Sequence, residues 1–140
     1  MKETDQKKIV TAVDEKRLLA TATALVDVPS PTCDATAVAA RLAEILTADG
    51  FEVERPDAGW PKAPAVVTRL HGSSVGRTLQ FDGHLDTVHL PFVPASVVDG
   101  NLLGLGASDM KGGIAACVEA MRALRDTDAL QGGSILLTTH

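Results

Sequence analysis

The stretch FDGHLDTV, residues 81–88, places Asp82, His84 and Asp86 at alternate positions of an otherwise apolar segment. Charged side chains are uncommon in buried strands unless they are paired or functional. Side chains at positions i and i+2 of a strand share a face, so we expect His84 and Asp86 to project together from the strand end, with Asp82 deeper on the same face. Because a metal-ligating imidazole usually donates its other N–H to a carboxylate, this spacing suits a metal site.

The H-x-D motif alone also fits a solvated strand end with a chance histidine. The glycine-rich stretch GASDMKGG, residues 106–113, favours the metal site because it places Asp109 at the start of a predicted helix, on a backbone that can bend sharply. Alternatives for this stretch are a phosphate-binding loop or a helix cap formed by Ser108 or Asp109. Lys111 lacks the spacing of a Walker loop, which disfavours nucleotide binding. A carboxylate together with a histidine favours Zn²⁺ or a similar divalent ion.

The segments around the two motifs predict alternating helices and strands. Apolar residues at helical spacing indicate the helices, and runs of β-branched and apolar residues indicate the strands. The Asp99-Gly100 pair predicts a tight hairpin. This alternation indicates an α/β layer structure with its chemistry at the carboxyl ends of the strands. The predicted helices cover 14–26, 34–48 and a segment that follows residue 113, and the predicted strands cover 51–56, 65–70, 78–85 and the final residues GGSILLTTH.

Composition excludes several classes of function. A net charge of −5 and a pI near 5.2 argue against a nucleic-acid groove, so we expect a small molecule or a protein as the partner. The N-terminal residues MKETDQKKIV lack the apolar region of a secretion signal, and no later segment is apolar enough to cross a bilayer, so we expect a cytoplasmic protein without a membrane partner. Cys33 and Cys117 have no pairing pattern and are expected to be free thiols, which leaves any metal to other ligands.

Together, GHLDTV at 83–88 and GLGASDMKGG at 104–113 resemble the two N-terminal signatures of metallopeptidase family 20. This family includes acetylornithine deacetylase, succinyl-diaminopimelate desuccinylase, aminoacylase and the glutamate carboxypeptidases. The resemblance implies the N-terminal portion of a zinc-exopeptidase-like α/β catalytic domain, with a mixed sheet flanked by helices and truncated before the second half of the sheet. Residues 1–140 would then form part of that domain, with the lid and dimerisation domain absent from this chain and a homodimer expected only for the complete chain.

The resemblance also implies roles for individual residues. His84 would be a ligand of one metal ion, Asp86 would be the catalytic carboxylate behind the ligands, and Asp109 would bridge two Zn²⁺ ions and precede a strained cis peptide. Co²⁺ or Mn²⁺ would be alternatives to Zn²⁺. A bridging carboxylate offsets the repulsion between two cations while the water between them becomes acidic enough to attack an amide carbon.

The implied activity is metal-dependent hydrolysis of the amide bond of an N-acyl amino acid or short peptide. The family's Glu-Glu pair, a general base and a metal ligand, would follow His140, and Glu119 is on the order of 13 Å along the helix from Asp109, so we expect these 140 residues alone to be inactive. Leu105 and His89 stand where the family commonly has Arg and Pro, which makes the substrate pocket uncertain but not the ligands. The alternative function is a non-catalytic metal-binding or small-molecule-binding module, or an interaction subunit.

Overall fold

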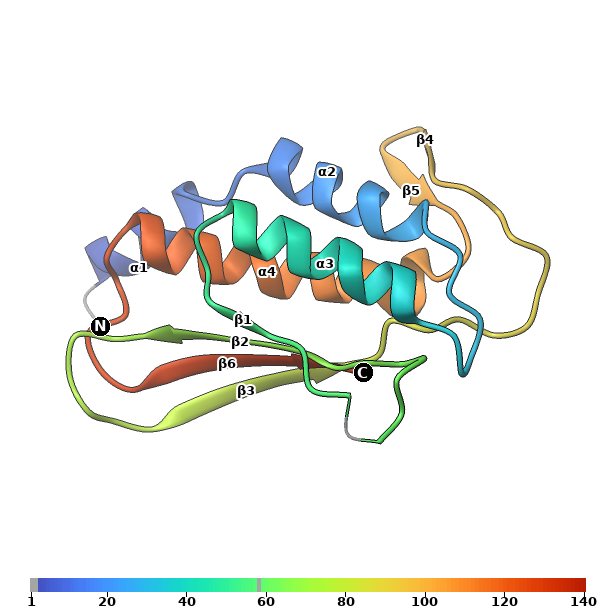
Figure 1. The fold of residues 1–140 in the computed structure, drawn as a ribbon. Helices are drawn as coiled ribbons and strands as arrows, with labels where there is room; N and C mark the ends of the chain where they lie inside the picture. The colour runs from blue at the N-terminus through green and yellow to red at the C-terminus, as the bar shows by residue number, and fades with distance from the viewer. Residues whose placement is uncertain (1–2, 58) are drawn as a thin grey trace.

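A four-stranded sheet with the order β1-β2-β6-β3 forms the base of the molecule, and helices cover one of its faces (Figure 1). The computed structural model describes residues 3–57 and 59–140. β3 runs parallel to β6, whereas β1 with β2 and β2 with β6 are antiparallel, so the sheet is mixed. The predicted α/β architecture is confirmed. The strands of this sheet are β1 (Val53–Glu54), β2 (Val66–His71), β3 (Thr78–Gly83) and β6 (Ser134–Thr139).

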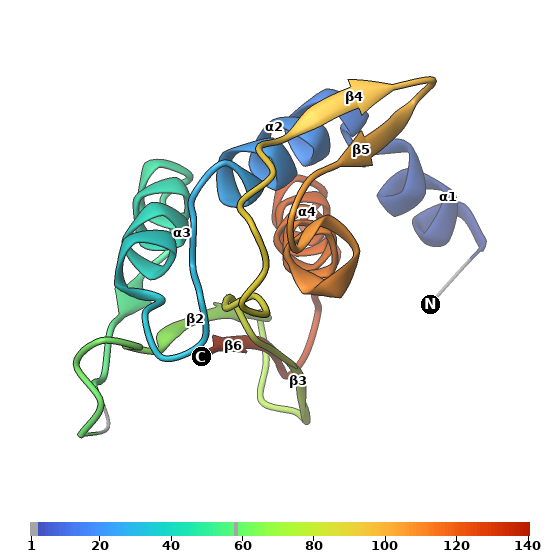
Figure 2. The ribbon, with the colours of Figure 1, turned by 90° about the vertical axis from the view of Figure 1, so that its right-hand side faces the viewer.

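The helices form two tiers above the sheet. Seen from one end, α3 and α4 lie directly over the strands and α2 lies above them (Figure 2), in agreement with the contacts of α3 with β2 and of α4 with β6. Within the described ranges, no helix combines the length and the hydrophobicity needed to span a bilayer. The helices are α1 (Glu3–Thr11), α2 (Glu15–Val26), α3 (Thr36–Ala48) and α4 (Gly112–Asp126).

The ends of α2 and α3 follow from local sequence signals. Asp14 caps α2, because its side chain accepts hydrogen bonds from the backbone N–H groups of Lys16 and Arg17 at 2.9 and 3.1 Å. α2 ends immediately before the Pro-containing segment VPSP. Gly50 has a φ of +83° just after α3, the left-handed conformation predicted for that position.

α1 is an element that the sequence analysis did not predict. Its residues are charged and mostly exposed, with no apolar stripe to signal a helix. The ammonium of Lys8 donates to the backbone carbonyl of Thr127 at 2.9 Å, beside the carboxyl end of α4. A cation is favourable at that end of a helix, so this contact with a distant segment holds α1 in a way that its own sequence does not reveal.

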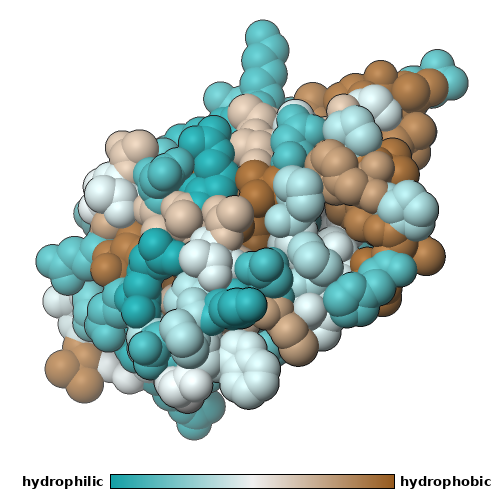
Figure 3. Space-filling view, turned by 45° about the vertical axis from the view of Figure 1, so that its right-hand side comes forward, coloured by the Kyte–Doolittle hydropathy of each residue, from teal (hydrophilic) through white to brown (hydrophobic). Residues whose placement is uncertain are grey.

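A small hairpin stands apart from the main sheet. β4 (Ser96–Val98) and β5 (Asn101–Leu103) are antiparallel, and both turn residues, Asp99 and Gly100, have positive φ angles of 51° and 77°. These are the angles of the predicted tight turn. Hydrophobic side chains gather at this end of the molecule (Figure 3). The exposed apolar residues of the hairpin and of the segment before it are Val88, Leu90, Phe92, Val93, Val97, Val98 and Leu103.

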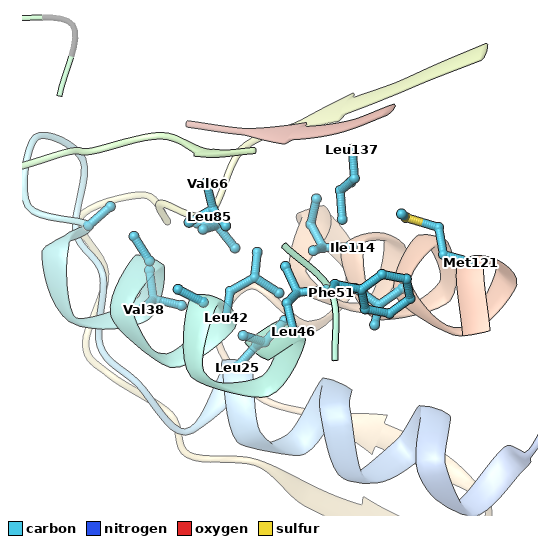
Figure 4. Packing of buried hydrophobic residues seen from close by; sticks show 14 of the residues in the cluster. Leu25, Val38, Leu42, Leu46, Phe51, Val66, Leu85, Ile114, Met121 and Leu137 are labelled. Atoms are coloured by element: carbon cyan, nitrogen blue, oxygen red, sulfur yellow. The ribbon is translucent and has the colours of Figure 1, made fainter. Parts of the chain in front are cut away.

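The hydrophobic core lies between the sheet and the helices (Figure 4). Leu85 and Leu137 come from the sheet side and meet Leu42 and Ile114 from the helices, and all four are at most 1% exposed. Leu19 of α2 is apolar but 39% exposed. Its side chain falls outside the stripe of α2 that faces α3 and α4.

The face of the sheet turned away from the helices carries a ladder of hydrogen-bonded polar side chains. Arg69 donates to Ser134 at 2.8 Å, and Gln80 donates to Thr138 at 2.9 Å. Thr138 in turn donates to Asp82. Within the described residues β3 is an edge strand of the sheet, and this face is largely polar.

A buried ionic network ties the two tiers of helices together. Glu119 of α4 is 1% exposed and accepts hydrogen bonds from Arg17 at 2.8 and 2.9 Å and from the backbone N–H of Asp14 at 2.9 Å. Arg122 contacts Glu119 and also pairs with Asp49 at the end of α3. Burial alone would raise the pKa of Glu119, but these donors outweigh it and lower the pKa below the usual 4.5.

Glu119→Gln is expected to destabilise the fold by about 3 kcal/mol at neutral pH, because it removes the carboxylate shared by the buried guanidinium of Arg122 and the partly buried guanidinium of Arg17. A folded-state pKa below the unfolded value means that the contribution is complete above pH 4.5 and is lost as the pH falls through the folded pKa. Urea unfolding at about pH 7 and about pH 3 measures both effects.

The matched control is Glu44→Gln, which breaks the exposed pair with Arg41 at 3.2 Å and is expected to cost less than about 1 kcal/mol. Equal losses for the two variants, or a Glu119→Gln penalty that grows in acid, would contradict the assignment of a stabilising buried network.

Candidate metal centre

Two backbone hydrogen bonds, one on each side of His84, fix the position of this residue. β3 ends at Gly83, earlier than predicted, but its pairing continues: His140 N–H donates to the Gly83 carbonyl at 3.0 Å, and Leu85 N–H donates to the His140 carbonyl at 2.8 Å. His84 therefore lies at the carboxyl end of the parallel pair β3 and β6, where the sequence predicts the chemistry.

Asp109 comes from a second element, the kinked turn η1 (Ala107–Lys111) that precedes α4, in which Asp109 and Met110 have non-helical backbone angles. Gly106 opens this turn with a φ of +80°, and the Asp109–Met110 peptide is cis, as the family resemblance implies. No side chain caps the turn. The cap that the sequence offered as an alternative for Ser108 or Asp109 is therefore not formed.

The structure brings the three predicted site residues together. His84 Nε2 lies 3.0 Å from Asp109 Oδ1, and His84 Nδ1 lies 3.1 Å from Asp86 Oδ1. The side chain of Asp109 is 85% exposed, whereas those of His84 and Asp86 are 34% and 29% exposed. The imidazole is thus held between two carboxylates, one partly buried behind it and one open to solvent in front of it.

This arrangement determines the protonation of the imidazole. Partial burial lowers the pKa of His84, but the hydrogen bonds and charges of Asp86 and Asp109 outweigh burial and raise that pKa above its usual value. When the Nδ1–H donates to the backbone carbonyl of Asp86 at 3.1 Å, the Nε2 lone pair points at the carboxylate of Asp109, and a positive species is required between them. A proton satisfies that requirement, and so does a metal ion.

The donor set suits a divalent cation. Two ligands at typical zinc distances and a tetrahedral angle lie about 3.3 Å apart, close to the 3.0 Å between His84 Nε2 and Asp109 Oδ1. In the described part of the chain, no group of three or more His, Cys, Asp or Glu side chains is arranged to hold a metal ion. These residues therefore supply a converging pair of ligand atoms, fewer than the four that a closed zinc site uses.

Beside this pair lies a cavity of about 310 Å³ lined by both motifs. The segment 86–88 and the glycine-rich segment 104–109 form two of its sides, and Thr32 from the segment between α2 and α3 contributes to its lining. Thr32 reaches this position because its N–H donates to the Thr87 carbonyl at 3.0 Å. The sequence analysis did not predict that Thr32 lines the site.

Other polar residues that the sequence analysis considered serve elsewhere. Asp82 shares the sheet ladder with Thr138 rather than the site, because β3 ends between it and His84. His89 is exposed and does not line the cavity. Cys33 and Cys117 are free thiols, as predicted.

Lys111 is 1% exposed although it lies in a glycine-rich turn, and burial lowers the pKa of its ammonium to about 8.

Comparison with known proteins places this geometry in a family. Residues 80–139 match the family model described as peptidase family M20/M25/M40. The chain is 40% identical over 130 residues to a succinyl-diaminopimelate desuccinylase of Methylorubrum populi, an alignment that covers 84% of this chain and 33% of that protein. It is 31% identical over 144 residues to the N-formyl-4-amino-5-aminomethyl-2-methylpyrimidine deformylase of Bacillus subtilis, with coverage of 94% and 33%.

Comparison of the fold with solved structures also finds a peptidase. A tripeptidase from Staphylococcus aureus superposes with a TM-score of 0.75 at 26% sequence identity, over 91% of this chain and 36% of the tripeptidase. The chain belongs to peptidase family M20/M25/M40. It spans about a third of the length of the curated relatives that it matches.

Gly106 and Gly113 provide a test of how tightly the Asp109 turn is built. Gly106→Ala is expected to destabilise the protein by at least about 1 kcal/mol, because a side chain is strained at a φ of +80° and its Cβ would lie 2.6 Å from Thr87 Cγ2. Gly113→Ala, on the exposed face of α4, is expected to stabilise by about 0.5–1 kcal/mol. Urea unfolding of both variants measures the difference, and a Gly106→Ala variant as stable as the parent would contradict the described turn.

Proposed function

We propose that this chain is part of a metal-dependent hydrolase that cleaves an amide bond of an N-acyl amino acid or a short peptide. The observation that carries the proposal is the convergence of His84 Nε2 and Asp109 Oδ1 at 3.0 Å, with the Asp86 carboxylate behind the imidazole. The relatives support the type of reaction, since a desuccinylase, a deformylase and a tripeptidase each release an acyl or peptidyl group.

Each of the three residues has a separate task in this proposal. His84 would bind the cation through Nε2, while its Nδ1–H donates to the backbone carbonyl of Asp86 at 3.1 Å, which fixes the tautomer. The carboxylate of Asp86, with Oδ1 3.1 Å from Nδ1, makes the ligating nitrogen more basic. Asp109 presents an exposed carboxylate to the same point and would be the second ligand, and its other carboxylate oxygen would be available to a second ion. When bound, divalent cations polarise the amide carbonyl and supply a nucleophilic water at neutral pH. Zn²⁺ fits the nitrogen and oxygen donors best, and Co²⁺ or Mn²⁺ can take its place.

The general base and the remaining ligands come, in this proposal, from outside residues 1–140. The cavity beside the site is lined by Asp86 and Asp109 but, among the described residues, by no glutamate. Glu119 is committed to Arg17 and Arg122 in the helical network. The 140 residues would therefore form part of a catalytic domain and be inactive alone, and the lid and dimerisation domain would belong to the rest of a cytoplasmic, homodimeric protein.

The cavity walls bear on the substrate. Leu105 and Val88 contribute apolar surface, and Thr32 contributes a hydroxyl, whereas the described lining contains no Lys or Arg. This side of the cavity is suited to an uncharged part of the substrate. A substrate carboxylate would be bound by the metal ions or by cationic groups from outside this chain.

Substitution at the site tests the proposal in the protein as its native cells produce it. His84→Ala is expected to lower kcat/KM by more than the roughly 10- to 100-fold that losing the carboxylate behind a ligand costs, and Asp86→Asn is expected to fall within that range. Metal analysis should show less bound metal in His84→Ala than in the parent protein. Activity against a panel of N-acyl amino acids and short peptides, before and after treatment with a chelator, provides the readout.

His89→Ala is the matched control, because His89 is an exposed imidazole five positions along the same segment and contacts neither carboxylate of the site. It is expected to retain the parent's activity and metal content. Full activity in His84→Ala would refute the metal assignment. A native protein that binds metal but hydrolyses none of the substrates would instead favour the non-catalytic binding module.

A further inference from the structure

We infer that residues 28–32, between α2 and α3, form a buried polar bracket that fixes the two halves of the candidate metal site relative to each other, with Ser30 and Lys111 as its positioning residues. One half is His84 with Asp86, on the continuation of β3, and the other is Asp109 on η1. The inference rests on the function proposed above, and it identifies the segment that keeps His84 and Asp109 at the spacing that a metal ion requires.

The first tie joins the bracket to the His84 half. Ser30 is 1% exposed, and its hydroxyl donates to the Leu85 carbonyl at 2.8 Å. Its own carbonyl accepts from the Thr87 N–H at 2.7 Å and from the Thr87 hydroxyl at 3.2 Å. Leu85 and Thr87 are the neighbours of Asp86 on either side. A single buried serine therefore holds the backbone on both sides of the carboxylate that orients His84.

The second tie joins the bracket to the Asp109 half. Lys111 is 1% exposed, and its ammonium donates to the Val28 carbonyl at 2.8 Å. Its backbone N–H donates to the Gly106 carbonyl at 3.0 Å, which closes the turn that carries Asp109. Burying an ammonium with one carbonyl partner costs free energy that an apolar side chain of similar length would not cost. The retained charge is therefore explained by the tie that it makes.

The bracket is short and stiff. Val28 and Ser30 are two residues apart, so both ties end on the same segment, and Pro29 and Pro31 flank Ser30. Each proline fixes its own φ angle. Pro31 also forms a parallel bridge with Thr87. A rigid segment held at two points can keep ligands from distant parts of the chain within the small tolerance that a metal site requires.

Two possible roles of the Lys111 ammonium predict opposite changes in metal affinity when the ammonium is removed. If its ammonium acted only as a nearby positive charge, removing it would strengthen the binding of a cation. If it acts as a tie, Lys111→Met loosens the Asp109 turn and weakens the binding. The sign of the change in metal affinity therefore separates the two roles.

The experiment compares Ser30→Ala and Lys111→Met with Ser134→Ala, in the protein as its native cells produce it. Ser134 is a buried serine whose hydroxyl is hydrogen-bonded to Arg69 and Thr78, far from the bracket in the sheet ladder. Zn²⁺ affinity is measured by competition with a chelator, and amide hydrogen exchange is measured on the metal-free proteins. We expect the two bracket variants to bind Zn²⁺ roughly 10- to 100-fold more weakly than the parent, and Ser134→Ala to bind it unchanged.

Hydrogen exchange gives a result that does not depend on metal. In the bracket variants the amides of Thr87 and Lys111 are expected to exchange faster, whereas in Ser134→Ala they keep the parent rates. Ser30→Ala is the milder change and keeps the test decisive if Lys111→Met does not fold. Parent-like affinity and exchange in Ser30→Ala would overturn the bracket and leave the proposed function standing. Faster exchange with no Zn²⁺ binding by the parent would support the bracket as a structural device and refute the proposed function.

Discussion

The parallel pairing of β3 with β6 is the interaction on which the site depends. His140, directly after β6, bonds through its backbone to the residues on both sides of His84, so the imidazole takes its position from the register of this strand pair. β6 lies between β2 and β3 and carries the buried Leu137, which ties that register to the hydrophobic core. A slip by one residue would turn Leu137 out of the core, so the packing that stabilises the sheet also fixes the position of His84.

The chemistry follows from what meets at the end of this strand pair. One segment supplies the imidazole with the carboxylate of Asp86 behind it, and η1 brings Asp109 to the opposite side of the ring. The segment between α2 and α3 joins the two by buried hydrogen bonds from Ser30 and Lys111. Two carboxylates from separate stretches of the chain thus flank one imidazole, at a point where positive charge is stabilised.

Local signals made much of this predictable from the sequence. The Asp99-Gly100 turn, the left-handed Gly50 and the stripe of α4 residues all act within a few positions of the chain, and the structure confirms them. The two site motifs were also visible, because charge in an apolar segment and a carboxylate among glycines are local anomalies. The features that the sequence did not reveal depend on contacts between distant parts of the chain. Lys8 holds α1 at the end of α4, and Thr138 of a neighbouring strand binds Asp82. The side chain of Lys111 is buried where it reaches the Val28 carbonyl.

X-ray absorption at the edge of the bound metal, recorded on the protein isolated from its native cells, tests whether these residues bind a metal ion. We expect a metal surrounded only by nitrogen and oxygen at about 2.0–2.2 Å, with the multiple-scattering signature of imidazole, because both cysteines are free and neither lines the site. The imidazole signature should weaken in His84→Ala. A sulfur ligand at about 2.3 Å, or a native protein that carries no metal, would contradict the account.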